Sequence, residues 1–231
     1  LAQLLVDENR KVVVEDPFYP DLRESLKQRT PNLTTLPVDD HGIVLDEAVI
    51  AEADIVIVTP SHQCPTTATL SLERRKLLLE LAIEHDVLII EDDYEFEMNF
   101  LEAPSPALKS MDSSGHVIYV GSFSKSLFPG LRLGYMVASE ELISEVRKLR
   151  HLMLRHPPGQ TQRTAAYFMA LGHYDAQIRR LRRHFESRRQ VLKEALAGAT
   201  LLEETGSQFG GTRFWIRGPE WLDSDKLADH A

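Results

Sequence analysis

The sequence has little cysteine and no long apolar run, and each absence excludes a class of protein. Its 231 residues include one cysteine, Cys64, so no disulfide can form within the chain. A single cysteine is typical of a protein from a reducing cytosol. No apolar stretch approaches the roughly 20 residues that a membrane-spanning helix needs, and no signal peptide is visible. The formal net charge of -9 argues against binding to nucleic acid or membranes through charge alone.

Several catalytic signatures are also missing. The sequence has no Walker loop, no Gly-x-Gly-x-x-Gly, no His-Glu-x-x-His and no paired cysteines for zinc, which removes the common nucleotide-binding and metal-dependent classes. The chain begins with Leu1 rather than methionine, and residues 1–6 and 227–231 both have the pattern of a helix cut short. We therefore expect a fragment or the ordered part of a longer chain.

Short apolar runs rich in β-branched residues recur along the first 140 residues. They cover residues 11–15, 54–58, 87–91, 116–120 and 133–138. Runs that are apolar throughout are typical of strands buried on both faces. A helix over residues 72–85, with Ser71 as its N-cap, lies between two of them. The alternation predicts an α/β fold with a mostly parallel sheet and helices on both faces.

The pattern changes after about Ser139. A long helical region is expected through Leu149 and past Tyr167, followed by an amphipathic helix over residues 174–196. Six arginines lie mostly off its apolar face, which indicates either a solvated or domain-contacting face or, as the weaker alternative, a DNA-binding helix. Gly210-Gly211 predicts a turn into a strand over residues 212–216.

These changes predict two domains. Residues 1–170 form a large domain that is incomplete at its N-terminus. Residues 171–231 form an interdomain helix and the beginning of a smaller, truncated C-terminal α+β domain.

The most informative segment is Gly121-Ser-Phe-Ser-Lys-Ser-Leu-Phe-Pro-Gly-Leu-Arg-Leu-Gly-Tyr135, which starts where a predicted strand ends. Ligands in such sheets bind outside the carboxyl ends of the strands. A lysine there, Lys125, can form an imine with an aldehyde. Ser122, Ser124 and Arg132 can hold a phosphate. Two glycines, Gly130 and Gly134, are expected to let the backbone turn and approach closely.

This segment resembles the fold-type-I, pyridoxal-phosphate-dependent (class I and II) aminotransferases. Its sequence is most similar to the corresponding segment in the aminotransferase-like domain of the MocR branch of GntR-type transcription regulators. The resemblance extends over about residues 6–214 and implies the three-layer fold of that family. It also implies pyridoxal phosphate as the cofactor, held by Lys125 as an internal aldimine, and a homodimer.

The resemblance assigns further cofactor contacts in Ile89-Ile-Glu-Asp-Asp-Tyr-Glu-Phe-Glu97. Asp92 would pair with the pyridine nitrogen, which makes the ring a better electron sink. Tyr94 would bind the phenolic oxygen of the ring. Without the lysine motif, the same dense carboxylates would indicate a solvated acidic loop or a divalent-metal site.

Two more segments resemble segments of the same family. In Thr59-Pro-Ser-His-Gln-Cys-Pro-Thr-Thr67, Cys64 stands where aminotransferases place an asparagine that contacts the ring oxygen, and Thr67 stands where they place glycine. The regulator branch shares Ser-His-Gln-x-Pro. A thiol nucleophile made of Cys64 and His62 is a remote alternative. In Glu15-Asp-Pro-Phe-Tyr-Pro20, Tyr19 would stack on the cofactor ring, or it would simply pack in a proline turn.

Three functions follow from these residues. The first is the effector domain of a cytoplasmic regulator that senses an amine, an amino acid or pyridoxal phosphate, with DNA bound by a winged helix-turn-helix outside these residues. The second is a working aminotransferase, which the loss of asparagine at Cys64 makes less favourable. The third is a serine hydrolase, because Ser122-x-x-Lys125 formally matches a β-lactamase-like motif, although its partner motifs are absent. No metal site is predicted.

Overall fold

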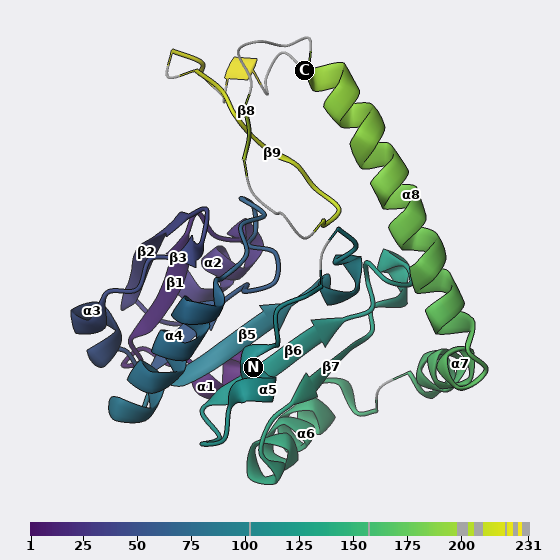
Figure 1. The fold of residues 1–231 in the computed structure, drawn as a ribbon. Helices are drawn as coiled ribbons and strands as arrows, with labels where there is room; N and C mark the ends of the chain where they lie inside the picture. The colour runs from purple at the N-terminus through teal and green to yellow at the C-terminus, as the bar shows by residue number, and fades with distance from the viewer. Residues whose placement is uncertain are drawn as a thin grey trace.

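The main feature of the fold is a seven-stranded, mostly parallel sheet (Figure 1). The computed structural model describes residues 1–101, 103–156, 158–197, 203–205, 210–219, 221–223 and 226–227. The strands follow the order β3-β2-β1-β4-β5-β6-β7. Their bounds are β1 Val12–Asp16, β2 Leu33–Asp39, β3 Gly42–Ile43, β4 Ile55–Val58, β5 Leu88–Asp93, β6 Val117–Ser122 and β7 Gly134–Val137. Each of the five predicted strands is therefore present, whereas β2 and β3 were not predicted.

Neighbouring strands from β2 to β6 run parallel, and only β3 and β7 are antiparallel to their neighbours. The carboxyl ends of β1, β4, β5 and β6 therefore meet at one edge of the sheet. The predicted α/β class with a mostly parallel sheet is confirmed.

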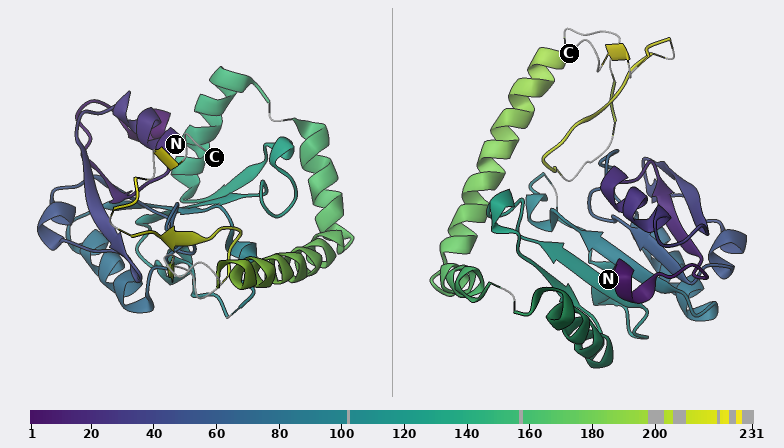
Figure 2. Two further views of the ribbon diagram at one scale, coloured as in Figure 1. Left: turned by 90° about the horizontal axis from the view of Figure 1, so that it is seen from above. Right: turned by 180° about the vertical axis from the view of Figure 1, so that it is seen from behind.

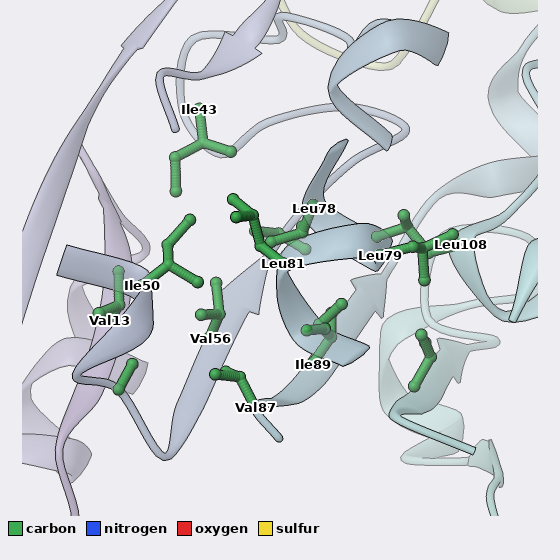
Figure 3. Packing of buried hydrophobic residues seen from close by; sticks show 14 of the residues in the cluster. Val13, Ile43, Ile50, Val56, Leu78, Leu79, Leu81, Val87, Ile89 and Leu108 are labelled. Carbon is green, nitrogen blue, oxygen red and sulfur yellow. The ribbon is translucent and has the colours of Figure 1, made fainter. Parts of the chain in front are cut away.

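Helices cover both faces of the sheet and divide its apolar side chains into two cores. Along β1, Val13 faces one core, whereas Val12 and Val14 face the other. The first core packs against α3 (Glu47–Ala51), α4 (Leu72–Glu84) and α5 (Leu108–Met111), as Figure 3 shows. The second packs against α1 (Ala2–Leu5), α2 (Pro20–Lys27) and α6 (Glu140–Leu154). These layers explain why the strands are apolar throughout.

The start of α4 agrees with its sequence signal. Ser71 is the N-cap, and its Oγ accepts a hydrogen bond from the Arg74 N–H at 3.2 Å. This contact satisfies one of the backbone donors that a helix start leaves free.

The predicted long helical region after Ser139 is not continuous. It is divided into α6, which ends at Leu154, and α7 (Gly159–Ala170). Arg155 adopts a left-handed φ of 62°, and Pro158 is the N-cap of α7, so neither residue continues a helix.

The last long helix, α8 (His173–Leu196), leaves the sheet and runs toward a small hairpin of β8 (Glu203–Thr205) and β9 (Trp215–Arg217). The views in Figure 2 place β9 above the carboxyl edge of the sheet. Two short 3-10 helices, η1 (Phe96–Met98) and η2 (Pro129–Leu131), follow β5 and β6. The strand predicted after Gly210-Gly211 is present as β9. Within the described residues, no helix is long and apolar enough to cross a bilayer.

The first core predicts a clear contrast between two adjacent leucines of α4. Leu78 is fully buried, whereas Leu77 is 43% exposed. Leu78→Ala should lower the free energy of unfolding by about 2–5 kcal/mol because it leaves a cavity. Leu77→Ala should change it by less than about 1 kcal/mol. Urea unfolding curves measure both, and equal losses would contradict this packing.

Candidate functional site

The carboxyl edge of the sheet gathers the residues that the sequence singled out. Tyr19 follows β1, Cys64 follows β4, Tyr94 follows β5 and Lys125 follows β6. Because these four strands run parallel, residues far apart in the sequence lie in one region. The guanidinium of Arg213 lies 2.9 Å from the Cys64 Sγ and 5.4 Å from the centroid of the Tyr94 ring, which places Cys64 and Tyr94 near one another.

Lys125 lies in a single helical turn directly after β6. The turn is closed by the Leu127 N–H, which donates to the Phe123 carbonyl at 2.9 Å. The Phe123 ring packs on Tyr135, with 5.3 Å between centroids, and edge-on against Tyr174 of α8 at 6.0 Å. Lys125 is partly buried. Burial raises the pKa of Glu95, which lies just after β5, and the charge of Lys125 opposes that rise.

The three candidate phosphate contacts differ in their placement. The Ser122 Oγ accepts a hydrogen bond from the Ser124 N–H at 3.2 Å, so Ser122 at the end of β6 is joined to Ser124, which directly precedes Lys125 in the turn. Arg132 ends η2 with a left-handed φ of 49° and is exposed. The structure gives Arg132 no contact with the other candidate residues within the described part of the chain, so its phosphate role stays a prediction.

Only one of the two glycines in this loop behaves as expected. A Cβ added to Gly134 would lie 2.7 Å from the Gly121 carbonyl oxygen, so the two strands approach too closely for a side chain. At Gly130, the nearest atom to an added Cβ is 3.6 Å away, an ordinary contact, and φ is not left-handed. The expectation that Gly130 is required for the turn is therefore wrong.

The two aspartates at the end of β5 have different surroundings. Asp93 is buried and accepts hydrogen bonds from the Ser61 Oγ at 3.0 Å and the Tyr119 Oη at 3.2 Å. Asp92 has no hydrogen-bond partner among the described residues, and burial alone raises its pKa to about 6. Adjacent strand residues point to opposite faces, which explains the difference. Both hydrogen bonds to Asp93 reach its Oδ2, and its Oδ1 is buried without a partner. The carboxylate of Asp92 has no partner at either oxygen in the described residues, so it is available to a ligand.

The other carboxylates of this segment have structural roles. Glu91 accepts hydrogen bonds from the Leu108 and Lys109 N–H groups at the start of α5, both at 2.8 Å. Glu97 accepts from the Tyr174 Oη at 2.6 Å. No group of three or more metal-ligating side chains is found in the described residues. The alternatives of a solvated acidic loop and a divalent-metal site are not supported by this arrangement.

Tyr94 carries a buried polar atom without a partner. Its hydroxyl is shielded from solvent and makes no hydrogen bond in the described structure. Burial raises the pKa of this phenol well above its usual range, so the hydroxyl remains protonated. A buried donor of this kind normally has an acceptor. The Tyr94 hydroxyl is therefore available to donate to a ligand.

Cys64 is buried, and its Sγ accepts a hydrogen bond from the Arg213 guanidinium at 2.9 Å. The same guanidinium lies 5.4 Å from the centroid of the Tyr94 ring. Thr67 adopts a left-handed φ of 63°, the conformation that favours glycine. This agrees with the resemblance, which places the family's glycine at Thr67.

Tyr19 does not pack in the protein interior. It is 42% exposed, and its hydroxyl donates to the Asp21 carboxylate at 2.6 Å. Its ring is therefore available for stacking, and the hydrogen bond to Asp21 raises the pKa of its hydroxyl. The alternative of a tyrosine packed in a proline turn does not match this exposure.

Two alternative nucleophiles lack the geometry they need. Neither ring nitrogen of His62 has a hydrogen-bond partner, and burial lowers the pKa of His62 to about 4. The Cys64 thiol contacts Arg213 instead, so the pair of Cys64 and His62 is not formed. The Ser122 Oγ bonds the backbone of Ser124, with no contact to Lys125 among the described residues.

Sequence reasoning missed the residues that organise this edge. Gln63 donates to the Glu15 carboxylate at 3.2 Å and to the Pro17 carbonyl at 2.7 Å, which joins the loops after β1 and β4. Arg213 was also missed. Its position two residues after Gly211 was the only signal, because its partner Cys64 lies far away in the sequence.

The fold and site define the class of protein. The family described as aminotransferase class I and II matches residues 1–226, so the chain belongs to this family. Among solved structures, a kynurenine aminotransferase of Pyrococcus horikoshii is 29% identical with a TM-score of 0.91, and the match covers 99% of this chain and 59% of that one. The predicted fold type and pyridoxal phosphate as the cofactor are confirmed.

Proteins with similar sequences indicate which branch of the family the chain resembles. The HTH-type transcriptional regulator TauR of Rhodobacter capsulatus is 47% identical over 98% of this chain and 47% of its own length. The probable rhizopine catabolism regulatory protein MocR of Rhizobium meliloti is 35% identical over 83% of this chain and 39% of its own length. The predicted resemblance to the MocR branch is confirmed. The chain spans about half the length of these regulators or less.

The burial of His62 predicts a specific pH dependence of stability. Its pKa is about 4 in the folded chain against an ordinary 6.5, because burial disfavours the charged ring. When the pH falls, His62 is therefore protonated in the unfolded state at a higher pH than in the folded state. The stability that a neutral His62 contributes is complete above pH 6.5 and falls, by about 3 kcal/mol in all, as the pH drops to 4.

Urea unfolding of the parent, His62→Leu and His62→Gln between pH 4 and 7.5 measures this effect. The difference in unfolding free energy between parent and either variant should shrink toward acid pH. Parallel curves for all three proteins would show that His62 does not titrate in this way.

Proposed function

We propose that this chain is the pyridoxal-phosphate-binding effector domain of a MocR-type transcription regulator, which senses an amine or amino acid at Lys125, or pyridoxal phosphate itself. The similarity to regulators such as TauR and MocR supports the regulatory part. The geometry of the carboxyl edge supports the binding part. The single observation that carries the proposal is the pair of unpartnered polar groups, Asp92 and Tyr94, at the carboxyl end of β5.

These two groups fit the cofactor that the family implies. Asp92 offers a carboxylate without a donor, which suits a protonated pyridine nitrogen. Tyr94 offers a buried hydroxyl without an acceptor, which suits the oxygen on the ring. The exposed face of Tyr19 suits stacking on a flat ring.

When bound, pyridoxal phosphate supplies an aldehyde that condenses with amines and a ring that withdraws electrons. In this chain, Lys125 would hold the cofactor covalently through its Nζ, and an incoming amine would compete for the same carbon. Ser122, Ser124 and Arg132 would bind the phosphate. Cys64 would lie beside the ring oxygen, where its thiol is a weaker donor than an asparagine amide.

In the whole protein, we infer that occupation of this site changes how residues 171–231 sit against residues 1–170. The large domain and the smaller C-terminal part would thereby transmit ligand binding to a DNA-binding region outside this chain. A homodimer and a cytoplasmic location accompany this proposal. Supporting observations are the regulator relatives and the single, buried Cys64.

A working aminotransferase is the second candidate, favoured by the likeness to the Pyrococcus horikoshii enzyme. There, Lys125 would also move a proton between substrate and cofactor carbons. Multiple-turnover conversion of an amino acid and a keto acid by the intact protein would establish this candidate. A single slow half-reaction would favour the sensor.

The role of Lys125 predicts covalent labelling. After addition of pyridoxal phosphate and borohydride to the protein, the peptide that contains Lys125 should carry the reduced cofactor, detected by mass spectrometry. Lys125→Ala should abolish this label, whereas Lys109→Ala, which removes a lysine near Asp112, should retain it. Labelling spread over other lysines, or no uptake at all, would refute the proposed site.

The role of Asp92 predicts weaker cofactor binding when its charge is removed. Asp92→Asn should raise the dissociation constant of pyridoxal phosphate by about tenfold or more, because a charge-assisted hydrogen bond to the pyridine nitrogen is lost. Asp86→Asn, at an exposed aspartate before β5, is the matched control and should leave it unchanged. Fluorescence titration measures both, and equal affinities in the two variants would count against Asp92.

A further inference from the structure

The residues directly after Asp92 and Tyr94 fasten the last long helix to the sheet. We call residues 95–99 the η1 segment, because they include η1. Within it, the side chain of Glu97 accepts a hydrogen bond from the Tyr174 Oη at 2.6 Å, and the Glu97 carbonyl accepts one from the Arg182 Nε at 2.7 Å. Both donors belong to α8 and lie about two helical turns apart. The first half of α8 is therefore held against the end of β5.

The η1 segment also contacts residues 210–214, which we call the pre-β9 segment. The Gly211 N–H donates to the Met98 carbonyl at 3.0 Å, and the Thr212 Oγ1 donates to the Glu95 carboxylate at 2.6 Å. Gly211 has a left-handed φ of 87°, which favours glycine at this contact. One short stretch of chain thus contacts both α8 and the segment that leads into the hairpin.

Arg189 joins α8 to the pre-β9 segment. Its guanidinium donates to the carbonyls of Gly210 and Arg213 at 3.2 and 3.3 Å. The same group lies 4.2 Å from the centroid of the Phe214 ring. Because α8 and the pre-β9 segment are bound to each other and both contact the η1 segment, a shift of the η1 segment would act on both.

The η1 segment contains a buried polar atom without a partner, which makes a second arrangement available. The Glu95 Oε1 and both ring nitrogens of His62 have no hydrogen-bond partner among the described residues, and the Oε1 lies 4.0 Å from the His62 Nδ1. A shift of about 1 Å would bring these two atoms to hydrogen-bond distance. Burial raises the pKa of Glu95 and lowers that of His62 to about 4, so a neutral carboxyl can donate to a neutral ring.

We propose that the η1 segment couples ligand binding at Asp92 and Tyr94 to the position of α8 and the pre-β9 segment. This inference rests on the proposed function and names the contacts that transmit it. A ligand that occupies the Asp92 carboxylate and the Tyr94 hydroxyl fixes the end of β5, which Glu95 directly follows. The η1 segment then shifts to pair Glu95 with His62, and the hydrogen bonds to Glu97 carry the shift to α8.

Hydrogen–deuterium exchange of the intact protein, with and without pyridoxal phosphate, measures this coupling in residues 173–182 at the start of α8. The first variant is Arg182→Met. The second is Tyr174→Phe, which keeps the ring that packs on Phe123 and removes only the hydroxyl. Arg183→Met is the matched control, because Arg183 is the exposed neighbour on the same helix.

In the parent and in Arg183→Met, pyridoxal phosphate should slow exchange in residues 173–182 by about fivefold or more, the effect of one net hydrogen bond on local opening. In Arg182→Met and Tyr174→Phe, the slowing should fall below about twofold, because a hydrogen bond to Glu97 is lost. The dissociation constant of pyridoxal phosphate should stay within about threefold of the parent value in both variants. A purely structural role would raise exchange equally with and without pyridoxal phosphate and leave the slowing unchanged.

Three results would overturn the inference. They are a parent in which pyridoxal phosphate leaves the exchange of residues 173–182 unchanged, variants that keep the full slowing, and variants that lose pyridoxal phosphate binding itself. Borohydride labelling of Lys125 in the same samples separates this failure from failure of the proposed function. A labelled parent with unchanged exchange in α8 leaves the binding site standing and removes the η1 segment as its connection to α8. An unlabelled parent contradicts the proposed function itself.

Discussion

Parallel pairing of β1, β4, β5 and β6 is the constraint on which the whole site depends. The cores on both faces make these strands apolar, so polar side chains are concentrated where the strands end. Parallel direction puts all of those ends at one edge. The register of β5 with β6, in which Asp92 pairs with Val120, then sets the aspartate beside the strand that leads into Lys125.

At this edge of the sheet, polar side chains that have hydrogen-bond partners hold the structure together. Polar side chains that have none are candidates for binding a ligand. One carboxylate oxygen of Asp93 accepts hydrogen bonds from Ser61 and Tyr119, which joins β5 to β6 and to the loop after β4. Asp92 and the hydroxyl of Tyr94 have no such partners in the described structure. A buried polar group without a partner, such as the Tyr94 hydroxyl, costs stability. Its presence beside the partly buried, unpartnered Asp92 is the expected signature of a binding site, where local stability gives way to function.

The parts of the fold that follow from short-range patterns could be predicted from the sequence. The five predicted strands, which are β1, β4, β5, β6 and β7, and the start of α4 at Ser71 depend on residues within a few positions of one another. The contact between Arg213 and Cys64 could not be predicted, because the two residues are 149 positions apart and meet only through the fold. The division between α6 and α7 depends on Arg155 and Pro158, whose effect the apolar periodicity around them conceals.

Among the site residues too, some could be predicted from the sequence, whereas others depend on the folded structure. The motif around Lys125 and the family resemblance pointed to Lys125, Asp92 and Tyr94, which lie at the carboxyl ends of β6 and β5. Their roles in cofactor binding stay predictions. Motif spacing was not enough to place Arg132, whose exposed, left-handed position depends on how η2 ends. Nor could it distinguish structural from available carboxylates, since Glu91 and Asp92 differ only in which face of β5 they occupy.

The central claim is that Asp92 and Tyr94 are left without partners in order to receive the cofactor ring. A crystal structure of the protein with pyridoxal phosphate tests this most directly. We expect the pyridine nitrogen within hydrogen-bond distance of the Asp92 carboxylate and the ring oxygen within the same distance of the Tyr94 hydroxyl. A ring bound elsewhere, with both groups still unpartnered, would contradict the account.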